Sequence, residues 1–218
     1  MAVNNATERR RPRPVPLAVA VLALLLSIAG CGAGAGTAPR GDAASAAFRG
    51  TTLPSPVDMP TVTLTDASGQ PYRLRQRSLG HVTLLYIGYT HCPDECPTTM
   101  ATLGTAVSRL PASDRARTSV VFITSDPARD TPTRLRGWLD TFNPAFTGLT
   151  GDWQTIATTA RALGIPVSPP STAPDGSEVV QHGTEILLFG TDAKARLLYS
   201  SDTTADDVTH DVETVLHG

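Results

Sequence analysis

The sequence lacks a basic patch and internal repeats, and it contains few aromatic residues. Four of the 18 basic residues and one of the 20 acidic residues lie in residues 1–30, so 14 and 19 remain beyond them, a net charge of −5 without a basic patch. This excludes a nucleic-acid-binding surface. No segment repeats, and 218 residues fit one domain with appendages. Aromatic residues make up only 5% of the chain, and its 18 prolines indicate loops rather than a second domain.

The chain also lacks an apolar run long enough to span a membrane comfortably. The run at residues 15–29 follows a cluster of arginines, whereas a transmembrane helix needs about 20 apolar residues. A basic segment before a short apolar run is typical of a secretory signal. The run ends at Ile28-Ala29-Gly30-Cys31, which resembles a bacterial lipoprotein signal. We therefore predict a signal peptide at residues 1–30 and lipidation at Cys31, with the Sec and twin-arginine export routes both open.

Residues 31–50 are predicted to be a lipidated, flexible tether because glycine, alanine, serine and threonine dominate them. Each buried methylene of a lipid chain contributes about 0.8 kcal/mol, so two or three chains would hold a domain on the membrane. The predicted location is the extracytoplasmic face of the cell membrane, where the protein meets an oxidising or metal-exposed compartment.

Residues 51–218 are predicted to form one α/β domain with a mixed central sheet flanked by helices. Continuous apolar runs predict strands buried on both faces, and spacings of three and four predict amphipathic helices. The turn 66–71 predicts an N-terminal β-hairpin. The expected strands are 62–64, 72–74, 82–87, 119–124, 185–189 and 195–199, and residues 51–60 should run extended. The expected helices start near Pro93 or Asp94, at Pro132 after an N-cap at Thr131, at 152 and at 204, with a loop at 168–178.

Cys92 and Cys96 are the only thiols left once Cys31 is assigned to lipid, so we expect them to act together. They fall at a strand-to-helix junction, with Cys96 in the first helical turn. Unpaired N–H groups and the helix dipole favour thiolate there, which predicts a depressed cysteine pKa. Residues four apart share one side of a helical turn, so both sulfurs can reach one point. Three interpretations stay open: a structural disulfide, a redox couple and a soft-metal site. A three-residue spacer is unusual for a redox pair, and a disulfide that closes so small a loop adds little stability.

Three stretches of the chain resemble the Sco/SenC family of copper-binding proteins. They read GYTHCPDECPTTM (88–100), FITSDPARDTPTRLRGWLDTF (122–142) and FTGLTGDWQTIATTARALGI (146–165), and the resemblance runs from about residue 57 to the C-terminus. It implies a thioredoxin-like fold. It also implies copper, as Cu(I) and also as Cu(II), bound by Cys92, Cys96 and His182. His182 is followed by Gly183 and Thr184, and Gln181 replaces the family's usual aspartate before the histidine, a change that could loosen the site.

The resemblance further implies a part in assembling the CuA centre of cytochrome c oxidase. The chain would be a metallochaperone, not an enzyme and without a catalytic residue, that delivers copper to the CuA domain of oxidase subunit II. Another copper chaperone is a further expected partner. Alternatively, Cys92 and Cys96 form a redox-active pair, and the protein is a thiol-disulfide reductase that keeps the cysteines of subunit II reduced. A redox or copper sensor without a client is a third reading.

The remaining candidates have simpler interpretations. His91 is expected to point away from the cysteines, and Met100 to pack in the core. Asp126 and Asp130 fit equally well a turn after the second buried strand and a loop beside the copper site. The other histidines, His81, His210 and His217, lie in contexts expected to be exposed or terminal.

Overall fold

The structure is a computed structural model that describes residues 48–173 and 178–218. The predicted signal peptide, the predicted lipidation site Cys31 and the predicted tether up to residue 47 lie outside the described residues. Among the residues described, no helix combines the length and the apolar character needed to cross a membrane.

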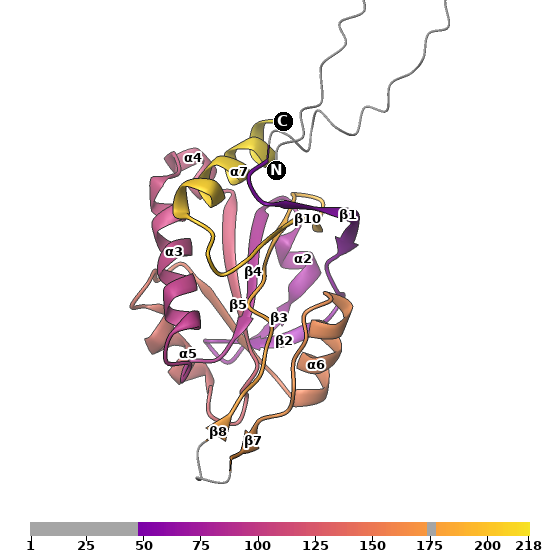
Figure 1. Ribbon diagram of the computed structural model, residues 1–218, viewed down its shortest axis with the longest axis vertical. Helices are drawn as coiled ribbons and strands as arrows, with labels where there is room; N and C mark the ends of the chain where they lie inside the picture. Colours follow the sequence, from indigo (N-terminus) through magenta and orange to yellow (C-terminus); the bar gives the residue numbers. More distant parts are fainter. Residues whose placement is uncertain (1–47, 174–177) are drawn as a thin grey trace, which may run out of the picture. The chain divides into compact units, whose positions relative to one another are not determined.

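A mixed sheet of eight strands, in the order β1-β10-β9-β4-β5-β6-β2-β3, forms the centre of the domain (Figure 1). Its central strands β4, β5 and β6 run parallel, and all other neighbours pair antiparallel. A separate pair, β7 and β8, precedes the segment that carries His182. The strands are β1 (Thr51–Asp58), β2 (Thr63–Asp66), β3 (Pro71–Arg73), β4 (Val82–Gly88), β5 (Thr118–Thr124), β6 (Thr147–Thr150), β7 (Ser171–Thr172), β8 (Glu178–Val179), β9 (Ile186–Phe189) and β10 (Lys194–Tyr199).

Helices cover both faces of this sheet. Apolar residues of α3, α5 and α7 pack on one face, and those of α2 and α6 pack on the other. The described helices are α2 (Leu74–Ser78), α3 (Glu95–Arg109), α4 (Ala112–Arg115), α5 (Pro132–Leu139), α6 (Trp153–Ala162) and α7 (Ala205–His217). The α/β class, the mixed sheet and the β2–β3 hairpin predicted from the sequence are confirmed.

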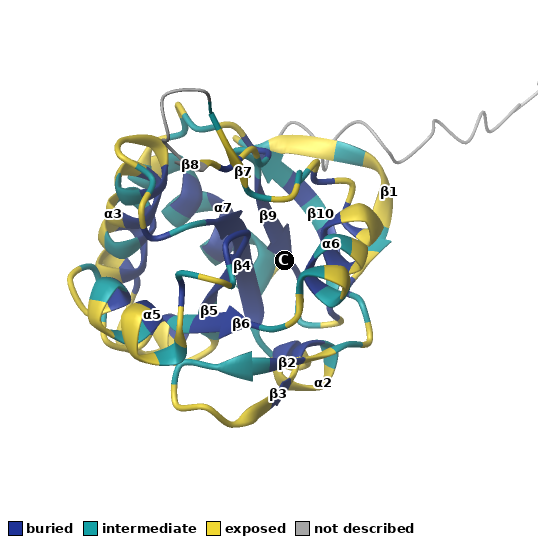
Figure 2. Ribbon diagram, turned by 90° about the horizontal axis from the view of Figure 1, so that it is seen from below, coloured by how far each residue is buried: buried dark blue, intermediate teal, exposed yellow. Residues whose placement is uncertain are grey.

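Strand β4 is buried along its whole length because it sits between these two layers (Figure 2). Side chains alternate between the faces of a strand. Leu84 and Tyr86 accordingly join the core under α3, whereas Leu85 and Ile87 join the core under α6. Two buried faces explain why the strand reads as an unbroken apolar run.

Asp211 of α7 fastens the start of the described domain to its last helix. Its carboxylate is fully buried and accepts hydrogen bonds from the backbone N–H groups of Arg49 at 2.9 Å and Gly50 at 2.7 Å. It also accepts one from the Tyr199 hydroxyl at 3.0 Å. A buried carboxylate needs such donors to replace water.

The structure corrects several local expectations. The residues expected to form one loop at 168–178 contain β7, which pairs with β8 at the far end of the loop. Strand β6 and the short helices α2 and α4 were not predicted. Trp153, expected to point inward, is only partly buried at the start of α6. Thr131 caps α5 as predicted, because its side chain accepts a hydrogen bond from the Arg134 N–H group.

Candidate metal centre

The two cysteines lie where β4 ends and α3 begins. Cys92 sits in the connecting loop, partly exposed, and Cys96 lies in the first turn of α3, fully buried. Asp94, the N-cap residue of α3, makes no capping hydrogen bond with its side chain. Instead the Cys96 backbone N–H donates to the Cys92 sulfur at 3.4 Å, so a sulfur satisfies one of the unpaired N–H groups of the helix end.

His182 lies beside the two cysteines although it comes 86 residues after Cys96 in the chain. It precedes β9, whose Ile186 pairs with Tyr86 near the end of β4. Backbone pairing with the segment after α6 fixes its position, since Val167 forms a bridge with His182 and the Gly183 N–H donates to the Pro166 carbonyl at 2.7 Å.

The His182 ring is oriented by its own chain and by two aromatic rings. Its Nδ1 atom lies 2.7 Å from the Gly183 carbonyl oxygen. A carbonyl only accepts, so Nδ1 carries the proton and the Nε2 lone pair is left to bind a metal. The rings of Tyr86 and Tyr89 approach the imidazole edge to face, with centroids 6.0 and 5.6 Å away. The Gly183 carbonyl thus provides the orienting contact that was in doubt because Gln181 replaces an aspartate.

These three side chains form a compact set of ligand atoms. The sulfurs of Cys92 and Cys96 and one ring nitrogen of His182 all lie within 4.8 Å of one another. The Cys96 sulfur is 3.5 Å from His182 Nε2. The structure therefore brings together the three residues that the family resemblance implied as metal ligands.

The environment of Cys96 is different from the one predicted. Burial raises the pKa of the Cys96 thiol to about 12, although a hydrogen bond from the Tyr89 backbone opposes the shift. The expectation of a depressed pKa is wrong for Cys96, because loss of hydration outweighs the helix end. The Tyr86 hydroxyl donates to the Cys96 sulfur at 3.7 Å, and burial also raises the pKa of Tyr86.

Gly88, the last residue of β4, makes room for the buried sulfur. A Cβ atom at this position would lie 2.7 Å from the Cys96 sulfur and 2.9 Å from the Tyr86 ring. Real Cβ atoms essentially never approach other heavy atoms this closely. Glycine is therefore required for the first turn of α3 to bring its cysteine against the strand.

Asp130 fastens the segment that precedes Cys92. Its fully buried carboxylate accepts from the Thr90 N–H at 2.9 Å, the Thr90 hydroxyl at 2.5 Å and the Thr124 hydroxyl at 2.6 Å. The Arg134 Nε–H group adds a hydrogen bond to the Thr90 hydroxyl at 3.1 Å. The end of β5 and the start of α5 thereby hold the cysteine loop in place.

His91, Asp126 and Asp130 also bring ligand atoms within 4.8 Å of one another. Protein donors already use both carboxylates, since Arg129 donates to Asp126 and Thr90 and Thr124 donate to Asp130. This favours the structural role over the metal-facing one for the two aspartates. His91 lies 3.6 Å from Asp130 and outside the cysteine cluster.

Met100 and His217 lie where the sequence placed them, whereas His81 and His210 are only partly exposed. Met100 is fully buried in the core under α3. His217, whose side chain is 60% exposed, pairs with Asp114 at 2.9 Å. The tyrosine beside Cys96 was missed because it was counted as part of an apolar strand, although a buried hydroxyl in such a run signals a polar partner.

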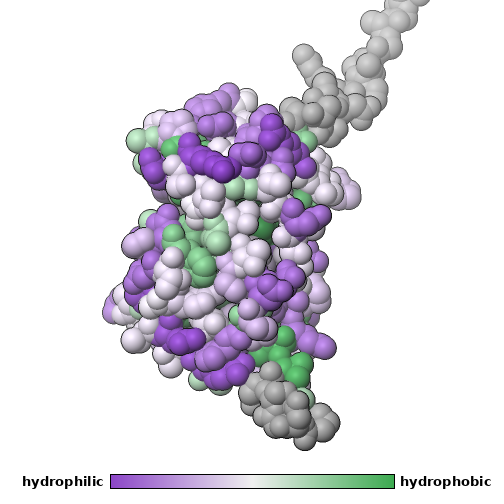
Figure 3. All heavy atoms as spheres, turned by 60° about the vertical axis from the view of Figure 1, so that its left-hand side comes forward, coloured by the Kyte–Doolittle hydropathy of each residue, from purple (hydrophilic) through white to green (hydrophobic). Residues whose placement is uncertain are grey.

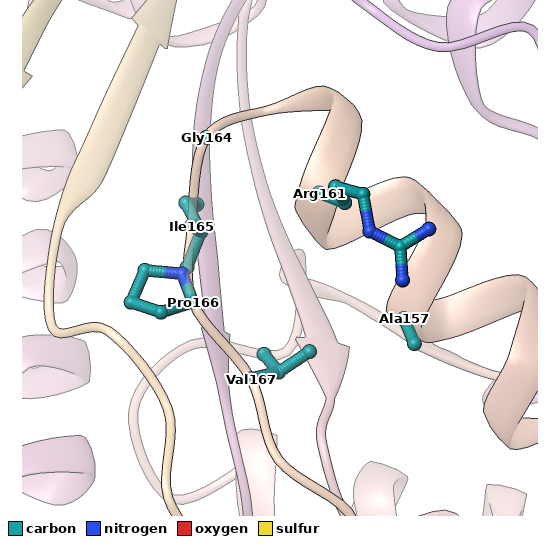
Figure 4. Close-up of a pocket in the computed structure, with 6 residues that line it drawn as sticks. All are labelled: Ala157, Arg161, Gly164, Ile165, Pro166 and Val167. Atoms are coloured by element: carbon teal, nitrogen blue, oxygen red, sulfur yellow. The ribbon is translucent and has the colours of Figure 1, made fainter.

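An apolar groove lies beside the segment that holds His182. It has a volume of about 480 Å³, and Figure 4 shows Arg161 and Ala157 of α6 facing residues 164–167 across it. The face shown in Figure 3 is mostly hydrophilic with small hydrophobic patches. Among the described residues, the large apolar side chains counted as exposed are Leu79 and Val179.

The donor set determines which metals suit this cluster. Two cysteine sulfurs and one imidazole select soft or borderline ions such as Cu(I) and zinc over hard cations. Structural zinc sites are almost always four-coordinate. Three ligands, with Cys92 and His182 only partly buried, fit an ion that accepts three donors and that an incoming ligand can reach.

Comparisons with known proteins point the same way. A family model described as SCO1/SenC matches residues 55–217. One relative, from Stutzerimonas stutzeri, has a provisional name as a copper-binding protein. It is 36% identical over 66% of this chain and 70% of its own length. The mitochondrial protein SCO2 of Saccharomyces cerevisiae is 34% identical over 58% of this chain and 42% of its own length, so the match spans less than half of that relative.

Solved structures agree with the sequence comparisons. The solution structure of apo Sco1 from Thermus thermophilus has a TM-score of 0.67 at 33% identity and covers 77% of this chain and 96% of that one. The structure of Bradyrhizobium japonicum ScoI with copper bound has a TM-score of 0.64 at 27% identity and covers 74% of this chain and 98% of that one. The thioredoxin-like arrangement expected from the sequence is the fold of these relatives.

Proposed function

Since the chain belongs to the SCO1/SenC family, we propose that it binds copper through the sulfurs of Cys92 and Cys96 and the Nε2 atom of His182. One observation carries the proposal. Three ligand atoms from a loop, a helix and a segment 86 residues further on lie within 4.8 Å of one another. The solved Bradyrhizobium relative with copper bound supports the choice of metal.

The residues around the site would each have a defined part in binding. Both thiols must lose a proton before their sulfurs act as ligands, so copper binding releases protons. The Gly183 carbonyl holds the His182 proton on Nδ1, which keeps Nε2 available. Cys96 is fully buried whereas Cys92 is partly exposed, so an incoming ligand would displace Cys92 before Cys96.

The proposed role is that of a metallochaperone. The domain would hold copper on the extracytoplasmic side of the cell membrane, anchored through a lipid on Cys31. It would pass copper by ligand exchange to the CuA domain of cytochrome c oxidase subunit II. A solved relative described as a member of a family of cytochrome c oxidase assembly proteins has the same fold, with a TM-score of 0.58. The tether before the domain would let it search the membrane surface for this partner.

A second function rests on the proximity of the two sulfurs. Cys92 and Cys96 are not joined by a disulfide, yet their sulfur atoms lie within 4.8 Å. A small shift would bring them to bonding distance, about 2 Å. The pair could therefore reduce a disulfide in the recipient, transferring two electrons and two protons while becoming a disulfide itself.

The decisive experiment is a Cu(I) titration of the purified full-length protein against a chromophoric chelator. Loss of an orienting contact typically weakens metal binding by about 10- to 100-fold, so His182→Ala, which removes a ligand, should weaken it by at least about 100-fold. His91→Ala is the matched control, because His91 adjoins Cys92 in sequence but lies outside the ligand cluster. Affinity of His182→Ala within about twofold of wild type would contradict the three-ligand site.

The same variant separates the two functions in cells. A metallochaperone needs His182, whereas a thiol-disulfide reductase needs only the cysteines. His182→Ala should fail to restore oxidase activity in a deletion strain, and Cys92→Ser should fail in either case. Full rescue by His182→Ala would favour the reductase.

A further inference from the structure

Tyr86 places a buried hydroxyl against the most buried ligand of the site. Its side chain projects from β4 into the core under α3 and is fully buried. The hydroxyl donates to the Cys96 sulfur at 3.7 Å, within hydrogen-bond distance for sulfur. The ring also meets the His182 imidazole edge to face, so one residue contacts two of the three proposed ligands.

Packing alone does not account for a tyrosine at this position. The ring lies against Phe122 at a centroid distance of 6.2 Å, and a phenylalanine would fill the same space. A buried hydroxyl without a partner is destabilising, so tyrosine in a core normally marks a hydrogen bond. Here the acceptor is the Cys96 sulfur.

A hydrogen bond to a metal-bound thiolate withdraws electron density from sulfur. Such bonds tune the electronic properties of copper–thiolate centres, and contacts behind a ligand set its orientation and strength. They are also stronger when the acceptor is charged. We propose that Tyr86 is a positioning residue that holds the Cys96 sulfur and limits its electron donation to copper. This inference rests on the proposed copper site, which it deepens.

Tyr86→Phe isolates the hydroxyl because it keeps the ring and its contact with His182. The matched control is Tyr199→Phe. Tyr199 is also buried in the same core cluster. It lies two strands away, opposite Ile186, which in turn pairs with Tyr86. Its hydroxyl donates to Asp211 rather than to sulfur. Urea denaturation of both variants would show that each is folded.

The first measurement is the absorption of the full-length protein loaded with a Cu(II) salt. Without its hydrogen bond the sulfur donates more readily, so the sulfur-to-copper charge-transfer band of Tyr86→Phe should move to longer wavelength. Tyr199→Phe should keep the wild-type band. An unmoved band in Tyr86→Phe, or an equal shift in both variants, overturns the proposal.

The second measurement needs no metal. In glutathione buffers, Cys92 and Cys96 give two electrons and two protons to glutathione disulfide, forming one protein disulfide and two glutathione thiols. Losing a hydrogen bond to the reduced sulfur should move this equilibrium of Tyr86→Phe toward the protein disulfide by about two- to tenfold. If the wild-type protein fails to bind copper, the proposed function is refuted. The glutathione equilibrium still tests Tyr86 separately, because an unchanged equilibrium in Tyr86→Phe refutes the role of its hydroxyl.

Discussion

Replacing Asp130 should release the cysteine loop and destabilise the whole domain. The carboxylate accepts three hydrogen bonds at 2.5–2.9 Å, two from Thr90 and one from Thr124. Thr90 and Thr124 are themselves buried, so alanine at position 130 leaves three donors without a partner and with little access to water. An unpaired buried polar group costs about 1–3 kcal/mol, and broken buried networks reach about 3–5 kcal/mol. We expect Asp130→Ala to lower the free energy of unfolding by about 3–5 kcal/mol.

The assay is urea denaturation of the reduced, metal-free protein. Asp130→Asn keeps one acceptor oxygen and should lose roughly half as much, about 2 kcal/mol. Asp140→Ala is the control, because Asp140 also accepts a hydrogen bond, from Arg136 at 2.8 Å, but its side chain is 47% exposed. An exposed pair contributes less than about 1 kcal/mol. Should Asp130→Ala unfold within about 1 kcal/mol of wild type, Asp130 would not anchor the loop.

A copper titration extends the same test to the site. Thr90 lies two residues before Cys92, so a released loop lets Cys92 move relative to Cys96 and His182. Asp130→Asn, the milder variant, should bind Cu(I) more weakly than wild type while remaining folded, and Asp140→Ala should bind as wild type does. Equal affinity in all three proteins would confine Asp130 to stability.

Three further predictions concern the cysteines. In the reduced, metal-free protein at pH 8, iodoacetamide should modify Cys92 at least about tenfold faster than the fully buried Cys96, as read by mass spectrometry, and equal rates would contradict the buried thiol. Burial raises the pKa of the Cys96 thiol from 9.0 to about 12 in the folded state. The neutral thiol therefore adds to the free energy of unfolding below pH 9, and this addition should disappear as the pH rises from 9 toward 12. Cys31→Ser should move the protein from the membrane fraction to the soluble fraction and abolish labelling by a fatty acid, whereas persistent labelling would place the lipid elsewhere.

The central strands and the long helices could be predicted because their sequences carry the signal themselves. The runs that became β4 and β5 are apolar on both faces, and α3 shows its apolar stripe from Met100 to Val107. Strand β6 has no such signal in its four residues Thr147–Thr150. It forms because β5 and β2 pair with it on either side, and such pairing depends on the fold rather than on the local sequence.

The candidate site, too, could be predicted only in part from its local sequence. The spacing of Cys92 and Cys96 indicated a shared point without help from the rest of the chain. His182 could be placed only through a family resemblance, because 86 residues separate it from Cys96 and nothing local distinguishes it from a structural histidine. The pKa prediction for Cys96 was wrong for a related reason, since a helix end is visible in the sequence but the burial of its sulfur is not.

Strand β4 connects these observations into one arrangement. It carries Tyr86 and Gly88 and leads directly into the loop of Cys92. Its antiparallel neighbour β9 follows His182, and its parallel neighbour β5 leads to the turn that holds Asp130. Backbone pairing or a buried hydrogen bond therefore fixes each proposed ligand without any metal. In a site that is already ordered in this way, little of the binding free energy is lost to ordering the protein. Because Cys96 is fully buried while Cys92 and His182 are only partly buried, an ion held by this proposed site would leave two of its three proposed ligands accessible to an acceptor.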